Sequence, residues 1–161
     1  MEEMRTTVEL NLDEYMRFAF TVQRQNKKYR RAKWILMIGL FALAVINFAT
    51  KNKSLGILMI LMVVAFPTVL DIMMKKQIRQ AYEQNKSIQG LKNELLFFDD
   101  HYEVHSEVGD NRYEYNKLWR IIETPTNFYI MMSETSGSVV IKSNCSDKLI
   151  NHIYEIKEKL E

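Results

Sequence analysis

The chain has 161 residues, of which 47% are hydrophobic, and its formal net charge is +2 at pH 7. That length accommodates a helical hairpin and one small domain and excludes a larger multidomain protein. The near-neutral charge argues against a nucleic-acid partner, because no global positive field exists to attract one. The single cysteine, Cys145, excludes a disulfide within the chain, which suits a reducing cytoplasm.

The first expected elements are a strand and a helix. The β-branched run Arg5–Leu10 predicts a short strand within residues 1–11, and the acidic, polar start predicts no cleavable signal peptide. Asn11 followed by Glu14 predicts a helix N-cap with a reciprocating carboxylate. A one-sided apolar stripe then predicts an amphipathic helix over residues 12–33 that runs unbroken into the next segment. We expect this stripe to pack on a domain or lie along lipid headgroups, with a partner groove as the alternative.

Two apolar runs follow, at residues 34–50 and 55–74, and the polar break between them holds Lys51 and Lys53. A bilayer core of about 30 Å needs about 20 apolar residues in a helix. Both runs are apolar on all sides, so we predict a transmembrane hairpin over residues 34–74 with a mild kink at Pro67. The alternative is a buried hairpin in a soluble protein, which so small a chain could hardly cover.

Basic residues flank the two runs and set the expected orientation. By the positive-inside rule, both termini lie in the cytoplasm of a multi-pass protein of the plasma (inner) membrane. The same residues could attract anionic headgroups, at about 1 kcal/mol each. This membrane-surface basic cluster consists of Lys27, Lys28, Arg30, Arg31, Lys33, Lys75, Lys76 and Arg79.

A helical linker is expected over residues 75–91, ending at Gly90. Asp71, at the edge of the second run, stands four residues before Lys75, a favourable spacing for an ion pair on one helix face. We expect a paired interfacial carboxylate here rather than an ion path.

From residue 92 the periodicity changes to that of strands. Turn signals at Asp99-Asp100, Gly109-Asp110-Asn111 and Pro125-Thr126-Asn127 separate five or six short antiparallel strands. A stripe of Leu149, Ile153, Ile156 and Leu160 predicts a terminal amphipathic helix from about Asp147. We therefore expect a cytoplasmic domain over residues 92–161, in which a curved sheet is capped by one helix and completed by the N-terminal strand.

Candidate catalytic, cofactor and metal residues form no convincing constellation. His101 and His105 share a strand face about 13 Å apart, without a suitable third ligand. Cys145 lacks a histidine partner in a nucleophile motif, and His152 is expected at the surface of the terminal helix. We predict no metal, no cofactor and no enzymatic activity. Aromatic strands could stack nucleic-acid bases, but a small sheet core explains them better without a basic surface.

Two stretches carry a family resemblance: VELNLDEYMRFAF near the start and YEYNKLWRIIETPTNFYIMMSETSGSVVIKS near the end. With the two apolar runs, they resemble the YcxB-like family of small bacterial membrane proteins. The pattern W-x-I-I-E, a turn and F-Y-I is formed by Trp119, Ile121, Ile122, Glu123, Phe128, Tyr129 and Ile130. The last strand, at Val140-Ile141-Lys142, lacks the proline that the family often has.

The resemblance implies an α+β membrane protein: a two-helix transmembrane hairpin plus a small antiparallel β-barrel of the pleckstrin-homology-like (PH-like) kind, capped by a C-terminal helix. It implies no catalytic or binding residues. Three functions are compatible with this architecture. In order, they are a membrane-anchored module for a protein or peptide partner or a second copy, a sensor of anionic headgroups, and an enzyme or transporter subunit.

Overall fold

A computed structural model describes residues 4–160. Residues 1–3 and 161 lie outside the described part, so the segments predicted at residues 1–11 and 92–161 are described only from 4 and up to 160. The chain divides into two compact units. One joins the chain up to Ala19 with the chain from Ala81 onward, and the other is Phe20–Gln80. We call them the sheet unit and the hairpin unit.

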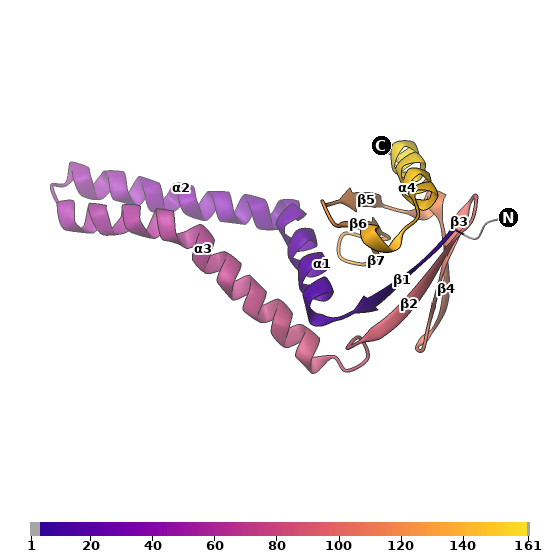
Figure 1. Cartoon of the computed structure of the whole chain (residues 1–161). Coiled ribbons are helices and arrows are strands. Elements are labelled where there is room, and N and C mark those ends of the chain that lie inside the picture. Colours follow the sequence, from indigo (N-terminus) through magenta and orange to yellow (C-terminus); the bar gives the residue numbers. More distant parts are fainter. Residues whose placement is uncertain (1–3, 161) are drawn as a thin grey trace. The chain divides into compact units, whose positions relative to one another are not determined.

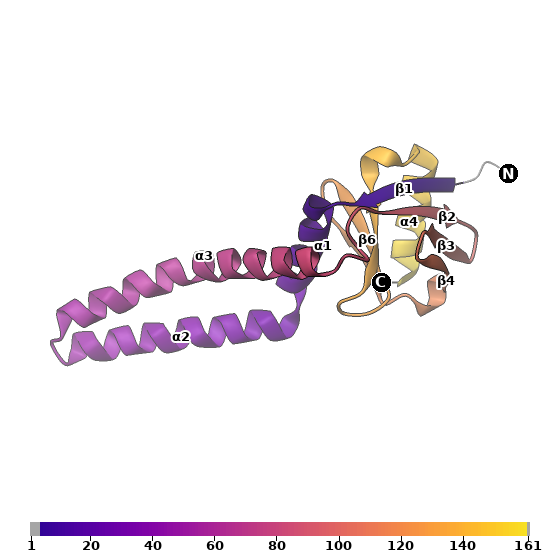
Figure 2. The same ribbon diagram turned by 90° about the horizontal axis from the view of Figure 1, so that it is seen from below.

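A four-stranded antiparallel sheet forms the first layer of the sheet unit (Figures 1 and 2). Its strands, in spatial order, are β1 (Met4–Leu10), β2 (Leu91–Phe97), β3 (His101–Ser106) and β4 (Gly109–Glu114). Strand β1 pairs with β2 along its whole length, from Met4 opposite Phe97 to Leu10 opposite Leu91. The N-terminal strand therefore completes a sheet whose other members lie some eighty residues later in the chain.

A three-stranded antiparallel sheet forms the second layer. After the 3-10 turn η1 (Tyr115–Lys117), its strands are β5 (Arg120–Glu123), β6 (Asn127–Met131) and β7 (Gly137–Ile141), with β6 in the middle. Every residue of β6 is buried. Gly137 is needed at the start of β7, because a Cβ atom there would lie 2.8 Å from the carbonyl oxygen of Ile130.

The expected closed barrel is wrong: the seven described strands form two separate sheets. Between β4 and β5 the turn η1 interrupts the extended chain. At the opposite ends, β1 meets η2 (Lys142–Asn144) through side chains rather than a backbone ladder. Thr6 Oγ1 donates to the Asn144 carbonyl at 3.2 Å, and Asn144 Nδ2 donates to the Thr7 carbonyl at 2.9 Å. Side-chain bonds replace the ladder that a barrel would require.

Helix α4 (Asp147–Leu160) lies where its stripe predicts, and Leu149, Ile153 and Ile156 are buried. The most deeply buried side chains of the two sheets are Leu95, Tyr102, Phe128, Tyr129, Ile130, Met131 and Val140. The Tyr102 ring stacks on Phe97 and Tyr113 with centroids 5.5 and 5.1 Å away. The turn predicted at Gly109-Asp110-Asn111 lies instead at Glu107 and Val108, and Gly109 opens β4 with a φ of 135°.

The helix predicted to run unbroken from residue 12 ends at Gln25. Helix α1 is Leu12–Gln25, and Asn26 separates it from α2, Lys27–Ala49. The Asn26 backbone is extended, with ψ at 119°, and its side chain accepts hydrogen bonds from the Lys28 and Tyr29 backbone N–H groups. Asparagine competes for backbone donors in this way and so begins a new helix instead of continuing the old one.

Helices α2 and α3 (Lys53–Gln84) run side by side in opposite directions (Figures 1 and 2). The connecting turn holds Lys51 at a φ of 64°. Near the turn the helices approach so closely that a Cβ atom on Gly56 would lie 2.9 Å from the Phe48 ring. Helix α3 bends partway along its length, consistent with the predicted kink at Pro67 inside it (Figure 1). Both helices are long and apolar enough to cross a membrane, and few of their apolar residues are buried.

Candidate functional site

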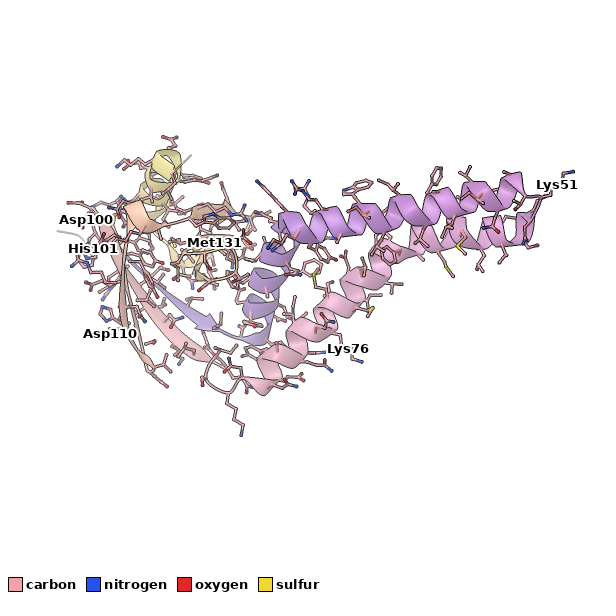
Figure 3. All side chains as sticks on the ribbon, turned by 180° about the vertical axis from the view of Figure 1, so that it is seen from behind. Lys51, Lys76, Asp100, His101, Asp110 and Met131 are labelled. Atoms are coloured by element: carbon pink, nitrogen blue, oxygen red, sulfur yellow. The ribbon has the colours of Figure 1, made fainter. Side chains whose placement is uncertain are left out.

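The four-stranded sheet has a free edge at β4. Strand β4 pairs with β3 on one side, and the described residues place no strand on its other side. Residues 109–112 are exposed along this edge, and Figure 3 shows Asp110 at the sheet's margin. An unpaired edge presents backbone donors and acceptors, which are the groups that a further extended segment would bind.

A hollow of about 210 Å³ adjoins this edge. Its lining consists of Arg112, Tyr113, Glu114, Lys117, Leu118 and Met132. The apolar side of the hollow is anchored, because Tyr113 stacks on the buried Tyr102 and the Tyr102 hydroxyl lies 3.5 Å from Met132 Sδ. The edge strand thus has a hollow with a partly apolar lining next to it.

Charges alternate along the outer face of β4. Asp110 lies 2.9 Å from His105 Nδ1, Arg112 lies 3.9 Å from Asp100, and Glu114 lies 2.9 Å from Lys117. The Asp110 carboxylate, which accepts a hydrogen bond from the imidazole, raises the pKa of His105. All three β4 side chains keep much of their surface in water, so they can contact a second chain as well.

His101 and His105 share one face of β3, and both lie beside the Glu103 carboxylate between them. Glu103 Oε1 is 3.4 Å from His101 Nε2, and Glu103 Oε2 is 3.4 Å from His105 Nε2. His101 Nδ1 also contacts Asp100, and this hydrogen bond lowers the pKa of the Asp100 carboxyl. Within residues 4–160, no group of three or more histidine, cysteine or acidic side chains is placed to hold a metal ion.

A second hollow, of about 330 Å³, lies where the turn after β2 meets η1 and the end of α4. Asp99 and Asp100 line it from that turn, and His152 lines it from α4. His152 Nε2 lies 3.1 Å from the Phe98 carbonyl oxygen, which also accepts a hydrogen bond from Tyr115. Cys145 lies elsewhere: its Sγ contacts Thr6 and the Ile141 carbonyl, and burial raises its thiol pKa.

Glu123, from the W-x-I-I-E pattern, joins three elements of the sheet unit. Its Oε1 atom accepts hydrogen bonds from Lys142 at 2.7 Å and Tyr154 at 2.6 Å, and Oε2 accepts one from Lys157 at 3.1 Å. These donors, with Lys142 first, lower the pKa of the Glu123 carboxyl to about 2. The carboxylate holds β5 to η2 and α4, so its role is structural.

Replacing Glu123 by glutamine is expected to change how stability depends on pH. A carboxyl whose pKa falls from 4.5 when unfolded to about 2 when folded stabilises the fold above pH 4.5. That contribution disappears as the pH falls toward 2. The Glu123→Gln variant should therefore be less stable than the parent at pH 7, and the gap should close between pH 4.5 and 2. Denaturant unfolding across this range measures it, with the exposed Glu107→Gln as control; a gap independent of pH would contradict the assignment.

The basic cluster lies in the hairpin unit, on the first turns of α2 and the later part of α3. Figure 3 shows Lys51 at the tip of the hairpin and Lys76 far along α3 from it. Lys27, Arg30 and Arg31 line a hollow of about 480 Å³ with three apolar residues of α2. Lys75 lies over the Phe20 ring, 5.4 Å from its centroid. Three members of the predicted cluster, Lys27, Arg30 and Arg31, thus lie on one surface, whereas Lys75 lies against Phe20.

Asp71 does not pair with Lys75 as its spacing predicts. Its carboxylate binds the guanidinium of Arg24 instead, and Arg24 also lies 4.8 Å from the centre of the Phe20 ring. This pair fastens the end of α1 to α3. Sequence spacing missed it because Arg24 precedes Asp71 by 47 positions and stands on a different helix. Asp71 is a paired carboxylate, as predicted, but the predicted partner Lys75 was wrong.

The N-cap prediction also holds in part. Asn11 Oδ1 accepts the Glu14 backbone N–H at 2.9 Å, whereas the Glu14 carboxylate turns away from Asn11. It accepts instead from Asn127 Nδ2 at 2.6 Å, in the core of the sheet unit, and from Arg17 at 3.3 Å. No local pattern announces this contact between a helix start and the central strand β6.

Two antiparallel sheets with a terminal helix, together with two helices long and apolar enough to cross a membrane, define a mixed α+β protein. Residues 97–146 match the family model described as YcxB-like protein, and this range extends from the last residue of β2 through β3–β7 and η2. This match agrees with the predicted resemblance over that region: the chain carries a YcxB-like region. No curated protein and no solved structure matches the chain.

Proposed function

We propose that the protein is a membrane-anchored, non-enzymatic interaction module. Its PH-like sheet unit faces the cytoplasm and binds a protein partner through the free edge of β4. The observation that carries this proposal is the exposed, unpaired β4 edge beside a hollow with a partly apolar lining. The sheet order, four strands then three and a terminal helix, supports the PH-like assignment.

The membrane anchor is the α2–α3 hairpin. Its side chains are uniformly apolar over a length that suits a bilayer, and most large ones are exposed in the structure. In water that surface would be a strong aggregation liability, whereas lipid tails would cover it. The basic residues at the open end of the hairpin favour an orientation with both termini in the cytoplasm, at the plasma (inner) membrane.

The partner is an extended segment that adds a strand to β4. Backbone hydrogen bonds would supply affinity, and alternate side chains would supply specificity. On one face, the partner needs an apolar side chain to contact Tyr113, Leu118 and Met132. On the other face, it meets the acid–base–acid series Asp110, Arg112 and Glu114, which selects opposite charges.

Site-specific photocrosslinking in intact membranes tests this function. A photoreactive amino acid replaces Arg112 on the free edge or, as a matched control, Thr7 on β1 of the same sheet. We expect a discrete protein adduct from position 112 and none from position 7. An adduct of two copies of the chain would identify the partner as a second copy. No adduct at 112, or the same adducts from both positions, would contradict the proposed edge.

A further inference from the structure

A stripe along one side of α2 changes from basic to apolar between adjacent turns. Its members recur every three or four positions and share one helix face. At about 1.5 Å per residue they extend over about 16 Å along the helix axis. The stripe consists of Lys27, Arg30, Arg31, Trp34, Ile35 and Ile38, and these residues line the 480 Å³ hollow. We call it the α2 stripe.

The basic half of the α2 stripe is not neutralised by the protein. Helix α2 contains no acidic residue, and the one carboxylate near the end of the second apolar run, Asp71, is bound to Arg24. Among the ion pairs of residues 4–160, none involves Lys27, Arg30 or Arg31. Three adjacent cations without a protein anion form a site for an anionic group, and arginine favours phosphate because it can donate two parallel hydrogen bonds.

The apolar half is uncovered. Trp34, Ile35 and Ile38 expose 60%, 69% and 63% of their surfaces. Tryptophan prefers the boundary between headgroups and hydrocarbon, and isoleucine prefers the hydrocarbon itself. A free phosphate would satisfy only the basic half, so the complete stripe is complementary to a molecule with an anion at one end and a hydrocarbon chain at the other.

We propose that the α2 stripe binds one anionic phospholipid from the surrounding bilayer. Its phosphate contacts Lys27, Arg30 and Arg31, its ester region lies at Trp34, and an acyl chain follows Ile35 and Ile38. The site rests on the membrane insertion proposed above, but it is independent of the β4 edge. It differs from general attraction to a charged surface, because only one side of the helix takes part.

Trp34 provides a direct reporter for this site. The full chain, with Trp119→Phe so that Trp34 is the sole tryptophan, is reconstituted in vesicles of phosphatidylcholine and phosphatidylglycerol in equal amounts. Bromine on the acyl chains of either lipid quenches Trp34 on contact. We expect the relative affinity for the site near Trp34 to be about fivefold or more higher for phosphatidylglycerol than for phosphatidylcholine. A preference of this size corresponds to one or two cations bound to the phosphate.

Three variants separate the stripe from bulk charge. Arg30→Gln with Arg31→Gln should abolish the preference, whereas Lys28→Gln with Lys33→Gln removes two charges from other positions on α2 and should keep it. Arg31→Gln with Ala32→Arg moves one cation off the stripe at constant charge and orientation, and should reduce the preference. Equal effects in the first two variants, or no effect in the third, would overturn the site.

Two further outcomes distinguish failure of the lipid site from failure of the proposed membrane anchor. If water-soluble glycerophosphoglycerol removes the preference, the apolar half contributes nothing and the phospholipid proposal is overturned, while the anchor stands. If neither brominated lipid quenches Trp34, the hairpin does not lie in the bilayer. That result overturns both the lipid site and the proposed anchor.

Discussion

The Asn127→Ala variant is expected to lose about 2–4 kcal/mol of unfolding free energy. Asn127 is fully buried at the start of β6, and its Nδ2 atom donates to the Glu14 carboxylate at 2.6 Å. Removing the amide leaves a largely buried carboxylate whose charged neighbour within residues 4–160 is Arg17, 3.3 Å away. A buried carboxylate that loses one of its donors is destabilised by more than the net contribution of the hydrogen bond itself.

Denaturant titration of the detergent-solubilised full chain measures this effect, with Trp34→Phe in the background so that Trp119 reports on the sheet unit. Asn111→Ala is the matched control: the same substitution on the exposed β4 strand should change stability by less than about 0.5 kcal/mol. Glu14→Gln keeps an acceptor for Asn127 and should cost less than Asn127→Ala. Equal losses for Asn127→Ala and Asn111→Ala would show that the buried pair contributes nothing.

Arginine at both Leu61 and Val64 is expected to raise the free energy of membrane insertion of the second span by roughly 6 kcal/mol. Both side chains are exposed, 61% and 72%, near the middle of the second apolar run. If lipid covers these two side chains, a charged group at either position raises the free energy of insertion. If water covers them, substitution at an exposed position changes little, within about 0.5 kcal/mol.

Flotation of membranes after expression measures the inserted fraction of the variant. Val108→Arg is the control, because Val108 is similarly exposed, at 67%, but lies on the turn before β4 in the sheet unit. We expect the double variant to leave the membrane fraction and the control to stay in it. Retention of the double variant at the parental level would argue against a bilayer around the hairpin.

Elements whose signals are local could be predicted. The two apolar runs appear as α2 and α3, because unbroken hydrophobicity needs no distant partner to form a helix. The terminal stripe appears as α4, whose Leu149, Ile153 and Ile156 side chains are buried as their spacing requires. The W-x-I-I-E pattern contains two core residues and one bridging residue. Ile121 and Ile122 are buried, and the Glu123 carboxylate accepts hydrogen bonds from three side chains.

One error arose where a local side-chain hydrogen bond overrode helix periodicity, and two arose where a long-range contact competed with a local preference. Helix periodicity runs through residue 26, but Asn26 bonds to the next backbone N–H groups and divides the helix. The spacing of Asp71 and Lys75 suits an ion pair, but Arg24 binds Asp71. The Glu14 carboxylate could have accepted a hydrogen bond from the Asn11 backbone in a capping box, but it accepts one from Asn127 in the core instead.

The candidate surfaces also include features that could be predicted from the sequence and features that could not. The basic cluster and the apolar spans could be predicted from residue types, because charge and hydrophobicity are properties of single residues, and the 3.6-residue helical repeat places Lys27, Arg30, Arg31 and Trp34 on one face. The place of the N-terminal strand in the later sheet is predicted from the sequence, but the division into two open sheets and the free edge of β4 are seen only in the structure. Strand pairing joins residues as distant as Met4 and Phe97, and such pairs are selected by the packing of the whole core rather than by any segment alone.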